Sequence, residues 1–166
     1  MDATTWQAGA VDDVVIRASR PEDMPAVADL RWQWSVGEGG ATPATTIQAY
    51  RDAMTTFAAT HPDTHRCVVA ERAGRVLGMA WLGLVARPPT PDRPGLRLTA
   101  DVQTVYVHPE LRGLGVAGRL VTALLDVADT LGVERTSVHS SVEGERLYRR
   151  LGFGDARLLM QRPPED

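Results

Sequence analysis

The stretch that decides the fold is DVQTVYVHPELRGLGVAGRLVTALLDVADTL, residues 101–131. Its first seven residues are rich in β-branched and aromatic side chains and contain no glycine or proline, which predicts a strand over 101–107. Pro109 ends this strand, because proline cannot donate to a central ladder. From Val116 onward apolar residues recur at helical spacing, which predicts a helix that stops at Gly132.

The junction between this strand and this helix is a glycine-rich loop that follows Arg112. The first N–H groups of a helix have no partner within the helix, and the helix dipole is positive at that end. Glycines lack a Cβ and so let a large anion approach the backbone closely. With the charge of Arg112, these features predict a diphosphate site. The alternative is a connecting loop with left-handed glycines and a solvated Arg112.

Two kinds of phosphate-binding loop fit this junction. Residues 113–118 satisfy the dinucleotide fingerprint G-x-G-x-x-G, and Glu134 lies at about the distance expected for a ribose-binding acid. In a dinucleotide fold, however, the first glycine lies at the strand end, whereas here four residues (109–112) intervene. That unit also usually opens its domain and is followed by several βα units, whereas here only 48 residues follow Gly118.

Residues 105–117, VYVHPELRGLGVA, resemble instead the acyl-CoA signature of the GNAT superfamily of N-acetyltransferases. That signature is (Gln/Arg)-x-x-Gly-x-(Gly/Ala) after a strand that ends in Val-x-Pro, and Arg112, Gly115 and Ala117 occupy its three defined positions. Residues 145–153, ERLYRRLGF, resemble the family's Leu-Tyr-x-x-Leu-Gly-Phe helix. Two separate motifs at this spacing are more specific than either motif alone.

The resemblance implies a mixed α/β fold of the GNAT type, in which a mixed, mostly antiparallel sheet splays between two strands and is flanked by about four helices. The order of the predicted elements agrees. Strands are expected over residues 14–18, 65–71, 75–86, 101–107, 135–139 and 156–161. Helices are expected from near Pro21 to Trp34, over 45–60, over 116–131, and up to Gly152 after a capping box formed by Ser140 and Glu143. Residues 35–43 are expected to form a loop. Residues 1–13 are expected to form a flexible arm before a single domain over 14–166.

Composition narrows the class of protein. The net charge of −3 argues against a nucleic-acid partner, and slightly favours cationic acceptors without deciding the question. The single Cys67 excludes an intrachain disulfide, and no Cys/His cluster has zinc spacing, so no metal is expected. The chain has neither an apolar run of membrane-spanning length nor a signal-peptide pattern. A cytoplasmic protein without membrane association is therefore expected.

The resemblance also assigns cofactor-binding residues. Backbone groups of Val105, Tyr106 and Val107 would pair with the pantetheine arm of acetyl-CoA and polarise the thioester carbonyl. The pyrophosphate would lie on the loop formed by Leu111, Arg112, Gly113, Leu114, Gly115, Val116, Ala117 and Gly118. Ser141 stands where the family often has an asparagine, and is a further candidate contact. Tyr148 would be the general acid for the CoA thiolate, because tyrosine, with a pKa of about 10, keeps its proton at neutral pH.

The general base is open at this stage. By the two-residue strand period, Asp101 and Gln103 share a face with Val105 and Val107. Asp101 is the candidate base, acting through a water, and the alternative is a charge at the strand edge; Gln103 can only orient a water. His139 is a weaker candidate for the base, and the alternative is that it has a structural role. Candidate contacts to the acceptor are Trp32 and Glu38, since the first helices line the acceptor site in the family; the alternative is that both are simply surface residues.

The predicted function is direct transfer of an acetyl group from acetyl-CoA to a primary amine, either of a small molecule or of a peptide N-terminus. One alternative is an acyl-CoA-binding sensor without turnover. A second is a dinucleotide-binding oxidoreductase domain. The sequence leaves a homodimer open.

Overall fold

A computed structural model describes residues 13–156 and 160. Five strands form one sheet in the order β1-β2-β3-β4-β5. They are β1 (Val14–Ala18), β2 (His65–Arg72), β3 (Arg75–Arg87), β4 (Arg97–Val107) and β5 (Thr136–Val138). The first four pair antiparallel with their neighbours, whereas β5 pairs parallel with β4. The expected mixed, mostly antiparallel sheet is confirmed.

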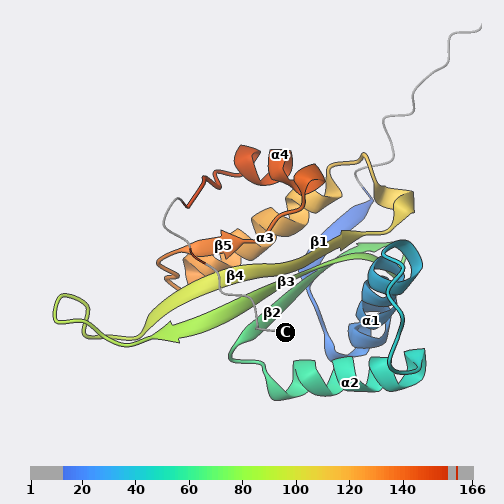
Figure 1. Ribbon diagram of the computed structural model, residues 1–166, viewed down its shortest axis with the longest axis horizontal. Coiled ribbons are helices and arrows are strands. Elements are labelled where there is room, and N and C mark those ends of the chain that lie inside the picture. Colours follow the sequence, from blue (N-terminus) through green and yellow to red (C-terminus); the bar gives the residue numbers. More distant parts are fainter. Residues whose placement is uncertain (1–12, 157–159, 161–166) are drawn as a thin grey trace, which may run out of the picture.

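Four α-helices cover the two faces of this sheet, with α1 and α2 on one side and α3 and α4 on the other (Figure 1). They are α1 (Met24–Trp32), α2 (Ile47–Thr60), α3 (Val116–Thr130) and α4 (Val142–Arg150). The shorter helical segments are η1 (Pro21–Asp23), the π-helical η2 (Gln33–Glu38) and η3 (Pro109–Leu111). In the described part of the chain, no helix combines the length and the apolar character needed to cross a membrane.

Each face of the sheet has its own apolar core. Beneath α3, Leu120 and Leu124 are fully buried against Leu82 and other side chains of the sheet. Beneath α1, Val27 and Met79 are fully buried in the second cluster. Burying one such side chain stabilises the fold by about 1.5–3 kcal/mol, so these stripes anchor both helices.

The expected loop over residues 35–43 is wrong in its first part. Gln33–Glu38 continues α1 as a π-helix, and the chain leaves helical geometry after Gly39. A π-helix has a wider turn than an α-helix, so the spacing that placed Trp34 on the apolar stripe no longer holds. Trp34 is 45% exposed, with the Arg31 guanidinium 5.6 Å from its ring centroid. The three glycines of this region led to a predicted loop that begins before the helix has ended.

Other boundaries differ less. β4 begins at Arg97, because residues 97–100 already pair with β3. The predicted capping box is wrong, since Ser141 is the N-cap of α4 and its Oγ accepts a hydrogen bond from the Gly144 N–H at 3.2 Å. Two predictions lie mostly outside the described residues, namely the strand over 156–161 and the arm over 1–13. Of the arm, the structure describes only Asp13.

The splay of the sheet is confirmed between β4 and β5. β5 pairs only with Ala100–Val102, whereas β4 runs on to Val107. Beyond Val102, no described strand pairs with this edge of β4. The open edge leads directly to the loop before α3, and it positions the candidate site.

Candidate active site

A β-bulge lies at the point where the sheet opens. Trp81 is opposite Thr104 and the next β3 residue, Leu82, is opposite Val102, so Gln103 is an extra residue in β4. An extra residue reverses the alternation of side chains along a strand. The bulge therefore divides β4 into two segments whose side chains alternate in opposite phase.

This reversal corrects the predicted face of β4. Val102 lies in the core beneath α3, and so do Val105 and Val107 on the far side of the bulge. Asp101 precedes Val102 in regular strand geometry and so points to the opposite face, toward the α1 side. The prediction that Asp101 and Gln103 share a face with Val105 and Val107 is wrong, because the bulge interrupts the two-residue period.

Gln103 and Asp101 instead lie together on the α1 side. A Cβ added to Gly83 would be 2.5 Å from Gln103 Nε2, so the glycine leaves room for this amide over β3. Asp101 pairs with Gly83 in the sheet, and its Oδ1 accepts a hydrogen bond from Ser137 Oγ at 3.0 Å. The partly buried carboxylate is thus oriented by β5, next to the bulge.

The backbone of β4 presents donors at its open edge. His108 N–H donates to Leu77 O of β3 at 2.8 Å. In an antiparallel pair alternate residues bond to the neighbouring strand, so Tyr106 N–H also points to β3. The N–H groups of Val105 and Val107 then point away from β3, to the side where β5 has diverged. Of the three predicted residues, Val105 and Val107 offer N–H groups at the opening.

The loop before α3 continues this line of donors. Gly113 and Gly115 have φ values of 79° and 73°, and a Cβ added to either would meet no atom within 4 Å. Gly115 is the N-cap, and the N–H of Arg119 donates back to its carbonyl at 3.3 Å. The N–H groups of Val116, Ala117 and Gly118 precede that bond and have no intrahelical acceptor. The buried Leu111 side chain anchors the loop, and Leu114 packs against the core.

This geometry is what a diphosphate needs. Left-handed glycines with open space above them form a cradle, and unpaired helix N–H groups with the helix dipole attract anions. The dinucleotide alternative fits less well, because Arg97 and Arg93 hold the carboxylate of Glu134 in ion pairs. These contacts, led by the hydrogen bond from Arg97, lower the pKa of Glu134 to about 2.

Arg112 is engaged within the protein. Its Nε donates to Val107 O at 3.1 Å, and its Nη2 lies 2.7 and 2.8 Å from the two carboxylate oxygens of Glu38. The Tyr106 hydroxyl also donates to Glu38, at 2.7 Å. Burial, followed by the contact with Glu38, raises the pKa of Tyr106 to about 12. The hydrogen bonds from Tyr106 and Arg112 lower the pKa of Glu38. Glu38, predicted as an amine contact, thus joins η2 to the loop before α3.

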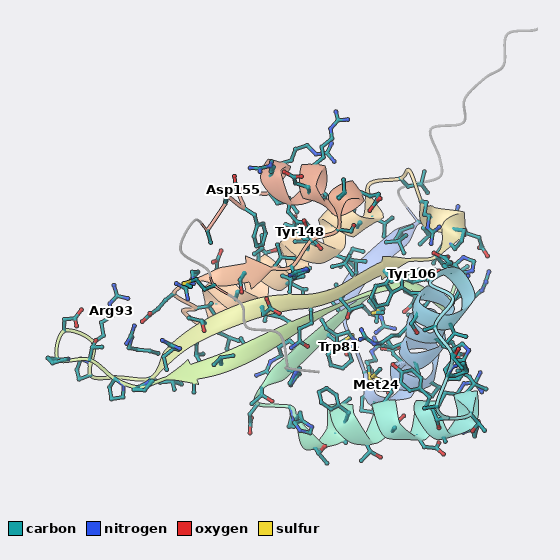
Figure 2. All side chains as sticks on the ribbon, viewed as in Figure 1. Met24, Trp81, Arg93, Tyr106, Tyr148 and Asp155 are labelled. Atoms are coloured by element: carbon teal, nitrogen blue, oxygen red, sulfur yellow. The ribbon has the colours of Figure 1, made fainter. Side chains whose placement is uncertain are left out.

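Tyr148 lies across the sheet from Tyr106 and Trp81, on the side of α3 and α4 (Figure 2). Its ring packs edge-on against Phe153 at 5.5 Å between centroids, and a Cβ on Gly144 would be 3.3 Å from it. It lines a groove between β5 and α4 together with Val138. Burial raises the pKa of Tyr148, so the phenol carries its proton at neutral pH.

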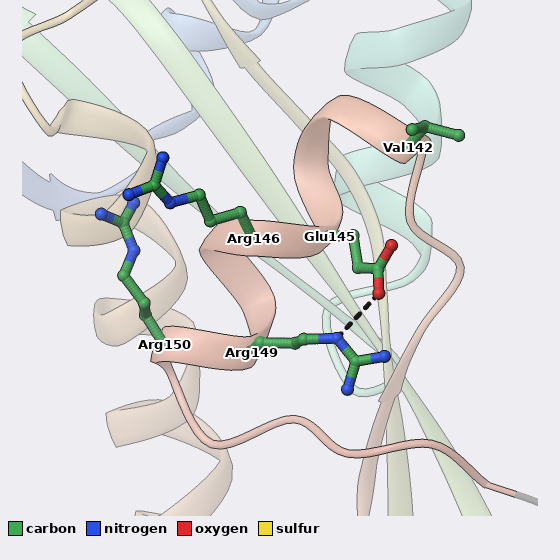
Figure 3. Close-up of a pocket in the computed structure, with 5 residues that line it drawn as sticks. All are labelled: Val142, Glu145, Arg146, Arg149 and Arg150. Carbon is green, nitrogen blue, oxygen red and sulfur yellow. Dashed lines mark hydrogen bonds and ion pairs between the residues drawn. The ribbon is translucent and has the colours of Figure 1, made fainter.

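Three arginines lie on the surface of α4, and they differ in whether an acidic side chain pairs with them (Figure 3). Arg149 donates to Glu145 at 2.7 Å and to Asp155 at 2.9 Å. Arg146 and Arg150 have no acidic partner among residues 13–156, and their side chains point to the same side in Figure 3. The intervening Leu147 approaches Gly118, where a Cβ would be 3.4 Å away. The two free charges therefore lie on a helix that contacts the start of α3.

On the α1 side, contacts come from segments far apart in sequence. The Trp32 and Tyr50 rings lie 5.8 Å apart and join α1 to α2. Arg31 donates a hydrogen bond to Thr104 Oγ1, directly after the bulge. The predicted His139 is exposed at the end of β5. Sequence reasoning missed Arg31 and Thr104, and no local pattern marks them, because they meet only through helix–sheet packing.

The model of the acetyltransferase (GNAT) family matches residues 24–153. The chain belongs to this family. Its solved structural neighbours include a predicted acetyltransferase from Clostridium acetobutylicum, solved with acetyl-CoA (TM-score 0.71, 18% identity, 90% of this chain and 96% of that chain). A second is an acetyltransferase from Trypanosoma brucei (0.69, 20%, 92% and 100%). A third is glucosamine-6-phosphate N-acetyltransferase from Arabidopsis thaliana (0.70, 17%, 92% and 99%).

At these identities the three neighbours establish the fold. No curated protein matches the chain by sequence. The family match makes the chain an acetyltransferase, in agreement with the resemblance drawn from residues 105–117 and 145–153.

Proposed function

We propose that this acetyltransferase moves an acetyl group from acetyl-CoA directly to a primary amine, of a small molecule or a peptide N-terminus. The observation that carries the proposal is a row of backbone donors in two segments. The first segment is Val105 and Val107 on the open edge of β4, and the second is the end of the loop 111–118 at the start of α3. This row matches a ligand with a polar arm and a diphosphate.

Each part of the row has a separate task. The loop residues 111–118 would hold the diphosphate, and Ser141, the N-cap of α4, would add a further contact. Val105 and Val107 would hold the arm and donate to the carbonyl oxygen, where negative charge develops; preorganised donors of this kind are usually the largest catalytic term. Acetyl-CoA supplies the activated thioester.

Two side chains would manage the protons from opposite faces of the opening. Asp101, oriented by Ser137, would accept a proton from the amine through a water that Gln103 orients, as the amine nitrogen bonds to the carbonyl carbon. Tyr148 would donate its proton to the sulfur as the carbon–sulfur bond breaks. Its raised pKa keeps the phenol protonated at neutral pH, as a general acid requires.

Release of free thiol from acetyl-CoA, measured across a panel of primary amines, tests this function. We expect product with at least one class of amine, and acetyl-CoA should raise the melting temperature whereas NAD should not. A ligand at 100 times its Kd stabilises by about 2.7 kcal/mol, which is readily measured. Binding without thiol release for any amine would indicate a sensor, and stabilisation by NAD alone would contradict the proposal.

The role of Asp101 has its own test. Asp101→Asn keeps the size of the side chain and removes its proton affinity. The rate should fall by about 10²-fold or more, and the acidic limb of the pH–rate profile should change. Ser137→Ala is the matched control for orientation, because it keeps the carboxylate; it should lower the rate less and keep that limb. An unaltered profile in Asp101→Asn would exclude Asp101 as the base.

A further inference from the structure

Arg31 reaches from α1 to the bulge of β4. It lies in the last turn of α1 and is partly buried, and its Nη1 donates to Thr104 Oγ1 across the gap between helix and sheet. Thr104 is the residue that follows the extra residue Gln103. The guanidinium therefore reaches the point of β4 where the sheet begins to open.

Arg31 differs from its neighbouring arginines in its partners. Arg51 is paired with Asp29 at 2.7 Å, and Arg112 is paired with Glu38 at 2.7 Å. Among the described residues, the Arg31 guanidinium contacts only neutral groups, namely the hydroxyls of Thr104 and Tyr50 and the ring of Trp34. A partly buried cation without an anion is costly, so this position favours an anion that comes from outside the chain.

A second donor, on the β3 residue opposite Thr104, has no hydrogen-bond partner among the described residues. Trp81 is opposite Thr104 in the sheet and is 6% exposed, yet its Nε1 makes no hydrogen bond within the described residues. Buried indole N–H groups usually find an acceptor. Tyr50 adds a third donor close to Arg31; burial raises its pKa, so its hydroxyl keeps its proton. The three groups are all donors, and none of them is an acid.

We propose that the acceptor carries an oxyanion, a carboxylate or a phosphate, a short distance from its amine, and that Arg31 binds this oxyanion. This inference rests on the proposed amine acetylation and names its class of substrate. The short distance follows from the contact of Arg31 with Thr104, which adjoins the bulge at the opening of the sheet. Amino acids and aminoalkyl phosphates have such a separation, whereas polyamines have no oxyanion.

Matched acceptor pairs test the proposal. An amino acid is compared with its amide, and phosphoethanolamine with ethanolamine, by kcat/KM for acetyl transfer. In the wild-type protein at least one anionic member should be preferred by tenfold or more. Whichever pair shows the larger ratio identifies carboxylate or phosphate. Arg31→Gln should reduce that ratio at least tenfold, whereas Arg31→Lys should keep part of it, because an ammonium is a point charge without the planar fork.

Arg51→Gln is the matched control, since Arg51 lies on α2 near α1 but pairs with Asp29. It should leave the ratio unchanged, and melting temperatures should confirm that all variants are folded. Equal use of neutral and anionic acceptors by the wild-type protein would overturn the proposal, as would an equal loss for both members in Arg31→Gln.

Calorimetry with the N-acetylated forms of the same compounds needs no turnover. If no amine is acetylated, the proposed function fails, and binding alone decides the inference. Preferential binding of the anionic forms, lost in Arg31→Gln, would support it. Equal or absent binding of the anionic and neutral forms would overturn it.

Discussion

The two faces of the sheet build their binding groups in different ways. On the proposed cofactor side, the groups are backbone N–H donors from one stretch, residues 105–118, shaped by left-handed glycines. On the proposed acceptor side, the groups are side chains from α1, α2, β3 and β4, such as Arg31, Tyr50 and Trp81. Backbone donors would suit what every acetyl-CoA has in common, whereas side chains, which change with each sequence, would suit a variable acceptor.

The largest effect should be on turnover, when the proposed general acid Tyr148 is changed. Tyr148→Phe should lower kcat and kcat/KM together by about 10²–10⁴-fold, because the phenol proton is needed only in the transition state. The ring and its contact with Phe153 remain, and no described residue hydrogen-bonds to the phenol. Acetyl-CoA affinity and melting temperature should therefore stay near those of the wild type. Turnover within about twofold of the wild type, with chemistry rate-limiting, would exclude Tyr148 as the acid.

The next largest effect should be on stability, through the ion pair that joins the start of α1 to β1. Asp23, at the start of α1, is 6% exposed and receives two hydrogen bonds from Arg17, at 2.6 and 2.9 Å. Asp23→Asn should lower the free energy of unfolding at pH 7 by about 1.5–3 kcal/mol, because it removes the charge from a carboxylate that accepts hydrogen bonds from a partly buried arginine. The exposed pair of Asp29 with Arg51 provides the control, and Asp29→Asn should cost at most about 1 kcal/mol. Denaturant unfolding measures both.

The pH dependence of this effect has a definite sign. The hydrogen bond from Arg17 lowers the pKa of Asp23 in the folded state. The carboxylate therefore stabilises the fold above the unfolded pKa of about 3.9, and this contribution is lost as pH falls through the lower folded pKa. The stability gap between wild type and Asp23→Asn should be full at pH 6 and narrow below about pH 4. An equal gap at both pH values would contradict an electrostatic origin.

Gly115→Val tests whether the cofactor side depends on bare backbone. A β-branched side chain at a φ of 73° is strained by about 1–3 kcal/mol, and its Cβ would fill the open space above the cradle. CoA affinity, measured by calorimetry, should fall tenfold or more. Gly95→Val is the control, because Gly95 has open space and lies outside the left-handed region. Unchanged affinity in a folded Gly115→Val variant would remove the loop from the proposed site.

The smallest effect should be on CoA affinity, when the ion pair between Glu38 of η2 and Arg112 of the loop before α3 is broken. Glu38→Gln removes the carboxylate that holds Arg112, so Arg112 becomes free to contact a diphosphate. CoA affinity should rise by up to about fivefold, since partly exposed ion pairs contribute at most about 1 kcal/mol. The gain should shrink at high salt. Glu110→Gln, which breaks the nearby pair with Arg75, is the control and should not raise CoA affinity. A lower CoA affinity in Glu38→Gln would contradict the view that Glu38 withholds Arg112 from the diphosphate.

Much of the fold follows from the sequence, because its signals are local. The alternating and helical patterns predicted every described strand and α-helix to within a few residues, and the Ala73-Gly74 turn connects β2 to β3 as expected. Gly132 takes the predicted left-handed conformation, with φ at 67°. The loop 111–118 could be predicted for the same reason, since its two glycines and the helix start after it leave N–H groups without partners whatever packs around them.

The orientation of side chains around the opening was decided by the tertiary structure. A bulge at Gln103 moves Asp101 to the face opposite Val105, and a π-helical turn moves Trp34 outward; neither has a local signal, because both depend on how a neighbouring element packs. The Arg31–Thr104 contact joins residues 73 apart, and the Arg112–Glu38 pair joins residues 74 apart. Local patterns determine the unpaired N–H groups at the start of a helix, whereas only the packed sheet decides which N–H groups of β4 stay free and which distant side chains meet across it.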